Sequence, residues 1–109
     1  MALPQINRLP LRFERDRLNK EGSPRHSPFL TIVKAPLPTG ITGPRFAVLI
    51  SKKINPNAVD RNRLKRQILS IIQEIKDLIP PADYMIIPKK TAESLSFLKL
   101  TSDIKSLLS

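Results

Sequence analysis

The chain has 109 residues, enough for one domain with a single hydrophobic core. Nineteen lysines and arginines against nine acidic residues give a formal net charge of +10, which favours a polyanionic partner, either nucleic acid or an anionic membrane. Because no apolar run approaches the roughly 20 residues of a spanning helix, no secretory signal opens the chain and no cysteine is present, we expect a soluble, cytoplasmic protein without disulfides, with residues 1–109 in one domain.

The first segments of the chain carry weak signals. Residues 1–11 contain Pro4 and Pro10 and show no hydrophobic period, so we expect a loosely ordered arm. Residues 12–21 predict a short helix that ends at Gly22. Its only large apolar side chains are Phe13 and Leu18, so the alternative is a segment that is only partly helical until RNA binds.

Two strands are expected next. Residues 28–34 contain aromatic and β-branched side chains between prolines, which favours a strand. Prolines and glycines then form a turn-rich connection. Residues 45–52 predict a second strand that pairs with the first in a hairpin, and its apolar residues on both faces indicate an inner position in the sheet.

Residues 57–79 predict an amphipathic helix with one basic face. Asn57 can cap its first turn, Asp60 suits the positive end of the helix dipole, and Pro80 ends it. The apolar stripe at helical spacing consists of Leu64, Ile68, Ile71, Ile72 and Ile75. The remaining face of the first turns carries Arg61, Asn62, Arg63, Lys65 and Arg66.

The crowding of cations on this helix needs a cause outside folding. Like charges at helical spacing repel by a few tenths of a kcal/mol per pair, and a polyanion would compensate that cost. An ordinary solvated basic face is the alternative interpretation. Three features favour phosphate binding instead: the charges have one sign, most are arginines suited to bidentate contact, and Asn62 adds a neutral donor and acceptor.

The last two elements complete the expected fold. Residues 83–88 predict an apolar strand, and the strand–helix–strand order implies that it runs parallel to the strand before the basic helix. A final helix follows a Ser96 cap, with apolar positions at Phe97, Leu100, Ile104, Leu107 and Leu108. The order indicates one α/β domain, a two-layer α+β sandwich of helices packed on a small mixed sheet.

A family resemblance rests on the basic helix and its neighbours. The run Arg61-Asn62-Arg63-Leu64-Lys65-Arg66, preceded by Ala58-Val59 and by Ser51-Lys52-Lys53, resembles the signature of the bacterial ribonuclease P protein subunit. Residues 83–87 and 95–97 match the same family in order. The resemblance implies a ribosomal protein S5 domain 2-like fold with the order α-β-β-β-α-β-α and a left-handed βαβ crossover, where the general rule would give a right-handed one.

The resemblance also implies a function. Ribonuclease P is an endonuclease, a ribonucleoprotein hydrolase that removes the 5′ leader from precursor tRNA. Its RNA subunit carries out the hydrolysis with bound Mg²⁺, while the protein, itself a monomer, binds the RNA subunit and the leader. The sequence agrees, because it has neither clustered carboxylates nor paired histidines, and its single histidine, His26, is expected in a surface loop. No catalytic or metal-binding residue is predicted.

The resemblance assigns residues to two RNA sites. The patch facing the RNA subunit comprises Lys52, Lys53, Arg61, Asn62, Arg63, Lys65 and Arg66. The leader would bind in a cleft between sheet and helices, through Phe13, Phe29, Ile32 and Arg45. Phe29 matches a family aromatic and Ile32 stands where relatives often have tyrosine, whereas Phe13 is shifted in register and lacks a second aromatic partner. Core packing is the alternative for both phenylalanines.

Two other functions fit the charge. A basic ribosomal or RNA-assembly protein with a structural role would carry the same basic helix but would not need a cleft on the sheet. A DNA-binding helix module is also conceivable, but the basic helix has no helix-turn-helix neighbour. Stimulation of precursor cleavage separates these alternatives from the ribonuclease P subunit.

Overall fold

The computed structural model describes residues 3–53 and 55–108. Three α-helices and four strands follow one another in the expected order α-β-β-β-α-β-α. Their bounds are α1 Leu11–Glu21, β1 Ser23–His26, β2 Leu30–Ala35, β3 Arg45–Val48, α2 Ala58–Ile75, β4 Asp83–Pro88 and α3 Phe97–Leu108. Three short 3₁₀ helices lie at η1 Gln5–Asn7, η2 Lys76–Leu78 and η3 Lys90–Ser94.

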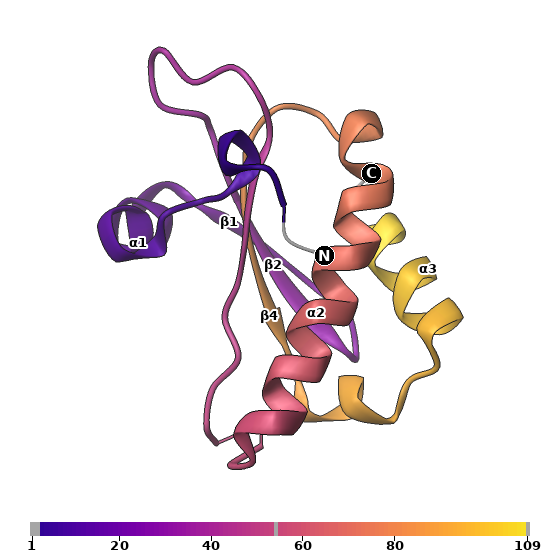
Figure 1. The fold of residues 1–109 in the computed structure, drawn as a ribbon. Helices are drawn as coiled ribbons and strands as arrows, with labels where there is room; N and C mark the ends of the chain where they lie inside the picture. The colour runs from indigo at the N-terminus through magenta and orange to yellow at the C-terminus, as the bar shows by residue number, and fades with distance from the viewer. Residues whose placement is uncertain (1–2, 54, 109) are drawn as a thin grey trace.

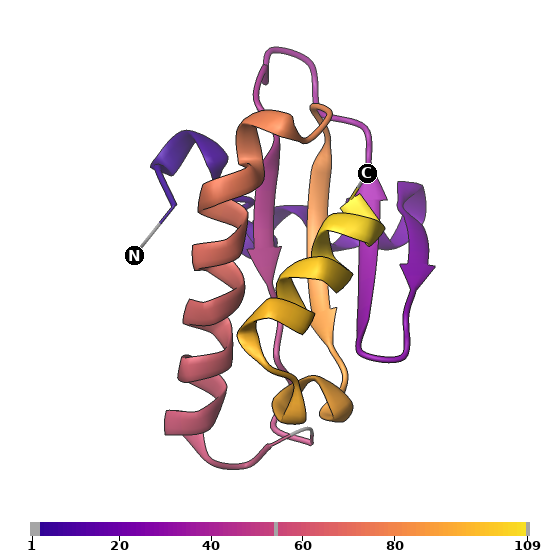
Figure 2. The same ribbon diagram turned by 90° about the vertical axis from the view of Figure 1, so that its right-hand side faces the viewer.

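The four strands form one mixed sheet in the order β1-β2-β4-β3. Helices α2 and α3 cover one face and α1 lies on the other (Figure 1). β3 and β4 are parallel, as predicted from the strand–helix–strand order. In Figure 2 both strands run downward, α2 lies in front of the sheet, and β4 lies to the right of β3, which makes this crossover left-handed, as the resemblance implied.

The predicted hairpin between residues 28–34 and 45–52 is wrong. β2 pairs with β1 and β4, both antiparallel, while β4 is the one described strand that pairs with β3, so β3 is the last strand of the sheet. It also ends at Val48 instead of reaching Lys52. The actual hairpin joins β1 to β2, and β1 was missed because its four residues are all exposed and carry no apolar period.

The first described residues pack against the sheet, unlike the loosely ordered arm expected for residues 1–11. Leu9 N donates to Phe46 O at 2.9 Å, which places the segment along the outer edge of β3. Leu3 and Leu9 are 3% and 5% exposed. Two isolated leucines among prolines produce no hydrophobic period, so this contact could not be predicted from the sequence. Residues 1 and 2 lie outside the described residues.

α2 forms as its sequence predicts. Asn57 Oδ1 accepts the Val59 N–H at 2.9 Å, and Asp60 lies in the first turn. The helix ends at Ile75 and passes through η2 before Pro80. Every residue of the predicted apolar stripe is buried: Leu64, Ile68, Ile71, Ile72 and Ile75. This burial turns the basic residues of the first turns away from the core.

The sheet separates two apolar clusters. The larger one lies under α2 and α3 and includes Leu30, Ile32, Phe46, Tyr84 and Ile86. The smaller one lies on the α1 side and is built around Leu9, Leu18, Ala35 and Met85. The two clusters therefore take alternate residues of β2, as a strand requires.

Candidate nucleic-acid interface

The basic face of α2 is largely open to solvent. Asn62, Arg63, Lys65 and Arg66 are exposed, whereas Arg61 is half-buried. Arg61 Nη1 donates to Asn55 O at 2.8 Å, so this guanidinium also ties the helix to the turn before it. The structure thus brings all five predicted α2 residues to one end of the helix, four of them without a share in the core.

Lys52 and Lys53 lie in the turn that follows β3, not at the end of the strand. Both are exposed, and Lys53 N–H donates to Ser51 Oγ at 3.0 Å. The loop that carries them leads into the N-terminal end of α2, at the lower end of Figure 2. The lysines and the α2 cations therefore lie at the same end of the molecule and can contact one polyanion.

A second surface lies on the opposite side of the sheet, beside α1. A hollow between α1 and the end of β3, here called the α1 groove, is lined by Leu11, Arg12, Phe13, Arg15, Asp16 and Leu49. Phe13 is 78% exposed, and the Arg12 guanidinium carbon lies 5.8 Å from its ring centroid. The groove thus combines an exposed aromatic ring with two arginines.

The four residues assigned to leader binding are not brought together. Phe13 lines the α1 groove, but Ile32 is 1% exposed in the core under α2 and α3. Phe29 packs against that same core, on the opposite side of the sheet. Phe29 was expected within the strand of residues 28–34, but β2 begins at Leu30 and Phe29 lies in the bend before it.

The sheet residues beside the α1 groove were missed. Val33, Ala47, Leu49 and Ile87 are half-exposed and pack against the α1-side cluster, and Thr31 shares the Val33 face by strand alternation. Alternation counted from Leu30 would have found Thr31 and Val33. The leader site was instead predicted around Phe29 and Ile32, from the family resemblance.

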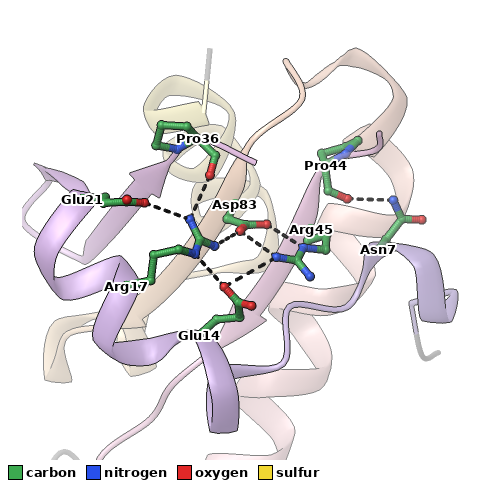
Figure 3. A network of polar contacts seen from close by, with 8 residues as sticks. All are labelled: Asn7, Glu14, Arg17, Glu21, Pro36, Pro44, Arg45 and Asp83. Atoms are coloured by element: carbon green, nitrogen blue, oxygen red, sulfur yellow. Dashed lines mark hydrogen bonds and ion pairs between the residues drawn. The ribbon is translucent and has the colours of Figure 1, made fainter. Parts of the chain in front are cut away.

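Arg45, the fourth assigned residue, belongs to a buried ion network shown in Figure 3. Its Nε and Nη2 donate to the two oxygens of Asp83 at 2.7 and 2.8 Å, and Asp83 is fully buried. Arg17 of α1 donates to the same carboxylate and, through Nε, to Glu14 at 2.6 Å. Arg45 is 8% exposed, so little of it can reach a nucleotide.

Both arginines of the network are held in the charged state. Burial works against the charge of Arg17, but hydrogen bonds to Glu14 and Asp83 outweigh it and raise the pKa of Arg17 above its ordinary value. The hydrogen bond to Asp83 likewise raises the pKa of Arg45. The network therefore stabilises both guanidinium ions.

His26 lies in β1 and not in a loop as predicted. It is exposed, and its Nδ1 lies 2.9 Å from Thr31 Oγ1 on the paired strand. Among the described residues, no three His, Asp or Glu side chains lie close enough to share a metal ion. Over the same residues, no helix combines the length and the apolar character needed to cross a membrane.

Comparison with known proteins points to one family. The model of the family described as Ribonuclease P matches residues 3–109. A ribonuclease P protein component from Bacillus velezensis is 44% identical over 63 residues, which are 58% of this chain and 53% of the relative, so the chain spans about half of that relative's length. A ribonuclease P protein component from Citrifermentans bemidjiense is 34% identical over 102 residues, covering 93% of this chain and 84% of the relative.

A solved structure agrees with these matches. The RNase P protein from Thermotoga maritima, in complex with 1-(4-fluorophenyl)-2-thiourea, superposes with a TM-score of 0.84 at 25% sequence identity. The superposition covers 93% of this chain and 96% of the Thermotoga chain. The two chains therefore share the same overall fold.

Proposed function

Because the chain belongs to the ribonuclease P protein family, we propose that it is the protein subunit of a ribonuclease P ribonucleoprotein that removes the 5′ leader of precursor tRNA. The observation that carries the proposal is the exposed basic face of α2, where Asn62, Arg63, Lys65 and Arg66 point away from a fully buried apolar stripe. In this proposal the RNA subunit carries out the hydrolysis in the cytoplasm, and the polypeptide, as a monomer, binds RNA.

The α2 face suits the backbone of a folded RNA. Guanidinium groups make paired hydrogen bonds to phosphate oxygens, and each neutralised phosphate releases counterions, which strengthens binding at low salt. Lys52 and Lys53 extend the same charged surface across the preceding turn. Bringing positive charge close to crowded RNA phosphates would also support the Mg²⁺ that the RNA subunit holds, and no step is assigned to a metal on the polypeptide.

The α1 groove suits the single-stranded leader. Single strands are bound without sequence preference where aromatic or apolar surfaces accept bases and nearby cations accept phosphates. Phe13 and Leu49 offer such surfaces, and Arg12 and Arg15 offer the charges. The half-exposed sheet residues Val33 and Ile87 lie on the same side of the sheet as the groove and replace Phe29 and Ile32 as the proposed base contacts.

The groove also argues against the rival role. A basic ribosomal or assembly protein with a purely structural role could use the same α2 face, but it would have no need for an open groove on the other side of the sheet. The family match points the same way. We therefore do not favour the structural alternative.

Reconstitution tests the proposal directly. The purified protein is mixed with a bacterial ribonuclease P RNA and a precursor tRNA at low Mg²⁺, where RNA alone cleaves slowly. We expect the protein to raise the cleavage rate and to leave the cleavage position unchanged. Absence of stimulation at every protein concentration, with the RNA shown to be active at high Mg²⁺, would rule out the proposed role.

A further inference from the structure

The contact between α1 and the sheet is unusually ionic. On its sheet side α1 carries three charged residues of the ion network, Glu14, Arg17 and Glu21, and two leucines. Leu18 is fully buried in the small α1-side cluster, and Leu11 is half-buried against it. An amphipathic helix normally docks through a wide apolar stripe, so α1 needs another source of orientation.

Asp83 supplies that orientation. It is the first residue of β4, fully buried, and it lies between Ala35 of β2 and Arg45 of β3 in the sheet register. Arg45 occupies both of its oxygens in a bidentate contact, which fixes the plane of the carboxylate. A carboxylate held in this way accepts the Arg17 guanidinium of α1 in one orientation.

Arg17 uses all three nitrogens of its guanidinium group to hold α1 in this orientation. Nη2 donates to Asp83, Nε donates to Glu14 at 2.6 Å, and Nη1 donates to Pro36 O at 2.9 Å. These acceptors belong to β4, to α1 itself and to the residue after β2 (Figure 3). A slide of α1 by one residue, or a rotation about its axis, would break at least two of the contacts.

The same helix forms one wall of the α1 groove. Five of the six lining residues lie on α1, within residues 11–16, and Leu49 after β3 forms the opposite wall. Whatever sets α1 against the sheet therefore also sets the distance between Phe13 and Leu49. The ion network connects Arg17, one turn further along α1, to that geometry.

We propose that Asp83, acting through Arg17, is a positioning residue for leader recognition, because it holds α1 at the distance from the sheet that lets the α1 groove take a single RNA strand. The inference rests on the proposed function. Neither residue contacts the leader, so the effect is transmitted through the position of Arg12, Phe13 and Arg15.

The test uses Arg17→Gln in the reconstituted complex. This substitution leaves the bidentate Arg45–Asp83 pair intact, so the buried carboxylate keeps a partner and the sheet keeps its fold. Lys20→Gln removes the same charge from the same helix at an exposed position outside both the network and the groove, and serves as the matched control. Affinity is measured for precursor tRNA with a leader and for the same tRNA without one, and amide hydrogen exchange reports on α1 and α2.

Arg17→Gln should weaken binding of the leader-bearing substrate by about five- to tenfold, the lower end of the loss for one base stack, and should leave the leaderless substrate unchanged. Amides of α1 should exchange faster while those of α2 do not. Lys20→Gln should change neither, and Arg17→Lys, which restores the charge but not the three-way contact, should recover only part of the affinity. Asp83→Asn should reproduce the Arg17→Gln pattern if it folds.

Two results would overturn the inference. Unchanged α1 exchange in Arg17→Gln would show that the network does not hold the helix, and faster exchange with unchanged leader affinity would show that its position does not matter for the leader. A wild-type complex that stimulates cleavage but binds both substrates equally would instead refute leader binding itself. A wild-type protein that fails to stimulate any cleavage would refute the proposed function.

Discussion

Arg61 and Arg63 lie two residues apart on α2 but differ in their attachments. Arg61 is half-buried and donates to Asn55 O at 2.8 Å, whereas the Arg63 side chain is exposed. Arg66 is exposed as well. We therefore expect Arg63 and Arg66 to contact RNA alone, and Arg61 to support the fold as well.

We expect Arg63→Ala and Arg66→Ala to weaken binding to the RNA subunit while changing the free energy of unfolding by less than about 0.5 kcal/mol, the usual range for surface substitutions. Each lost phosphate contact should lower the slope of log affinity against log salt by about one. Arg61→Ala should in addition cost roughly 1 kcal/mol of stability, because a hydrogen bond to the turn is lost. Binding titrations at several salt concentrations check this; an unchanged slope would place these arginines outside the interface.

Tyr84 gives the protein a pH-dependent stability. Its ring stacks on Phe46 with centroids 5.3 Å apart, and its hydroxyl donates to Pro80 O at 2.7 Å. Burial disfavours the phenolate and so raises the pKa of Tyr84 above its ordinary value. The folded state thus keeps a proton that the unfolded chain loses, and this contribution to stability is present below about pH 10 and is lost above it.

Tyr84→Phe should therefore cost about 1 kcal/mol at neutral pH, where the hydrogen bond is lost. Above about pH 10 the difference in stability between wild type and variant should shrink. The wild type loses stability there because its unfolded chain ionises the phenol, whereas the variant has no phenol to ionise. Chemical denaturation from pH 7 to 11 measures both values. A constant difference across that range would show that the phenol is not desolvated in the folded protein.

At the scale of elements, α2 carries two functions on opposite faces. Its buried stripe forms much of the main core, and its first turns present the proposed RNA surface. α1 differs, because its contact with the sheet depends largely on ion pairs. Its C-terminal end also lies very close to β2: a Cβ at Gly22 would overlap the Leu18 carbonyl and the Val33 side chain. α2 should therefore remain ordered under conditions that loosen α1.

A truncation on the buried face of α2 should have the opposite effect to the arginine variants: it should lower stability without weakening binding to the RNA subunit. Ile68 is fully buried, and Ile68→Ala should lower the free energy of unfolding by roughly 2–5 kcal/mol through lost burial and a cavity. Affinity for the RNA subunit, corrected for the folded fraction, should stay at the wild-type value. Denaturant unfolding paired with binding measurements checks both, and wild-type stability would mean that the helix is rotated from the orientation described.

At the scale of the whole molecule, the sheet separates the two proposed RNA surfaces. The α2 face and the α1 groove lie on opposite sides, so one RNA subunit and one leader can be contacted at the same time (Figure 1). The formal charge of +10 attracts both by long-range potential. Specific effects of substitution should therefore appear on one ligand and not on the other.

Leu49→Glu should test the groove, because it places a negative charge beside the proposed leader path at a half-exposed position. We expect weaker binding of leader-bearing precursor tRNA, by about one stacking contact or roughly 1–3 kcal/mol, and unchanged binding of leaderless tRNA. Phe29→Ala is the comparison, since it removes core packing and should lower stability without discriminating between the substrates. If Phe29→Ala is selective for the leader and Leu49→Glu is not, the leader lies on the other side of the sheet.

Elements with local signals could be predicted from the sequence alone. The 3.6-residue period of Leu64 to Ile75, the Asn57 cap and the prolines after Ile79 identify α2 and its exposed cations without reference to any other segment. The parallel pairing of β3 with β4 followed from chain order, because a helix between two strands carries the chain back across the sheet. The left-handed sense of that crossover came from the family resemblance, against the general rule.

Which strands are neighbours and which charges are buried depends on contacts between distant parts of the chain. β2 pairs with β4 across about 50 intervening residues, and such pairing depends on packing against helices that are distant in the sequence. Phe29 lies on the core side because the strand begins one residue later, and a shift of one residue exchanges the two faces. Nothing in the sequence marks Asp83 as buried or pairs it with Arg45 and Arg17, and Arg45 was assigned to the leader site. A carboxylate is stable in the interior only where the fold brings cations to it.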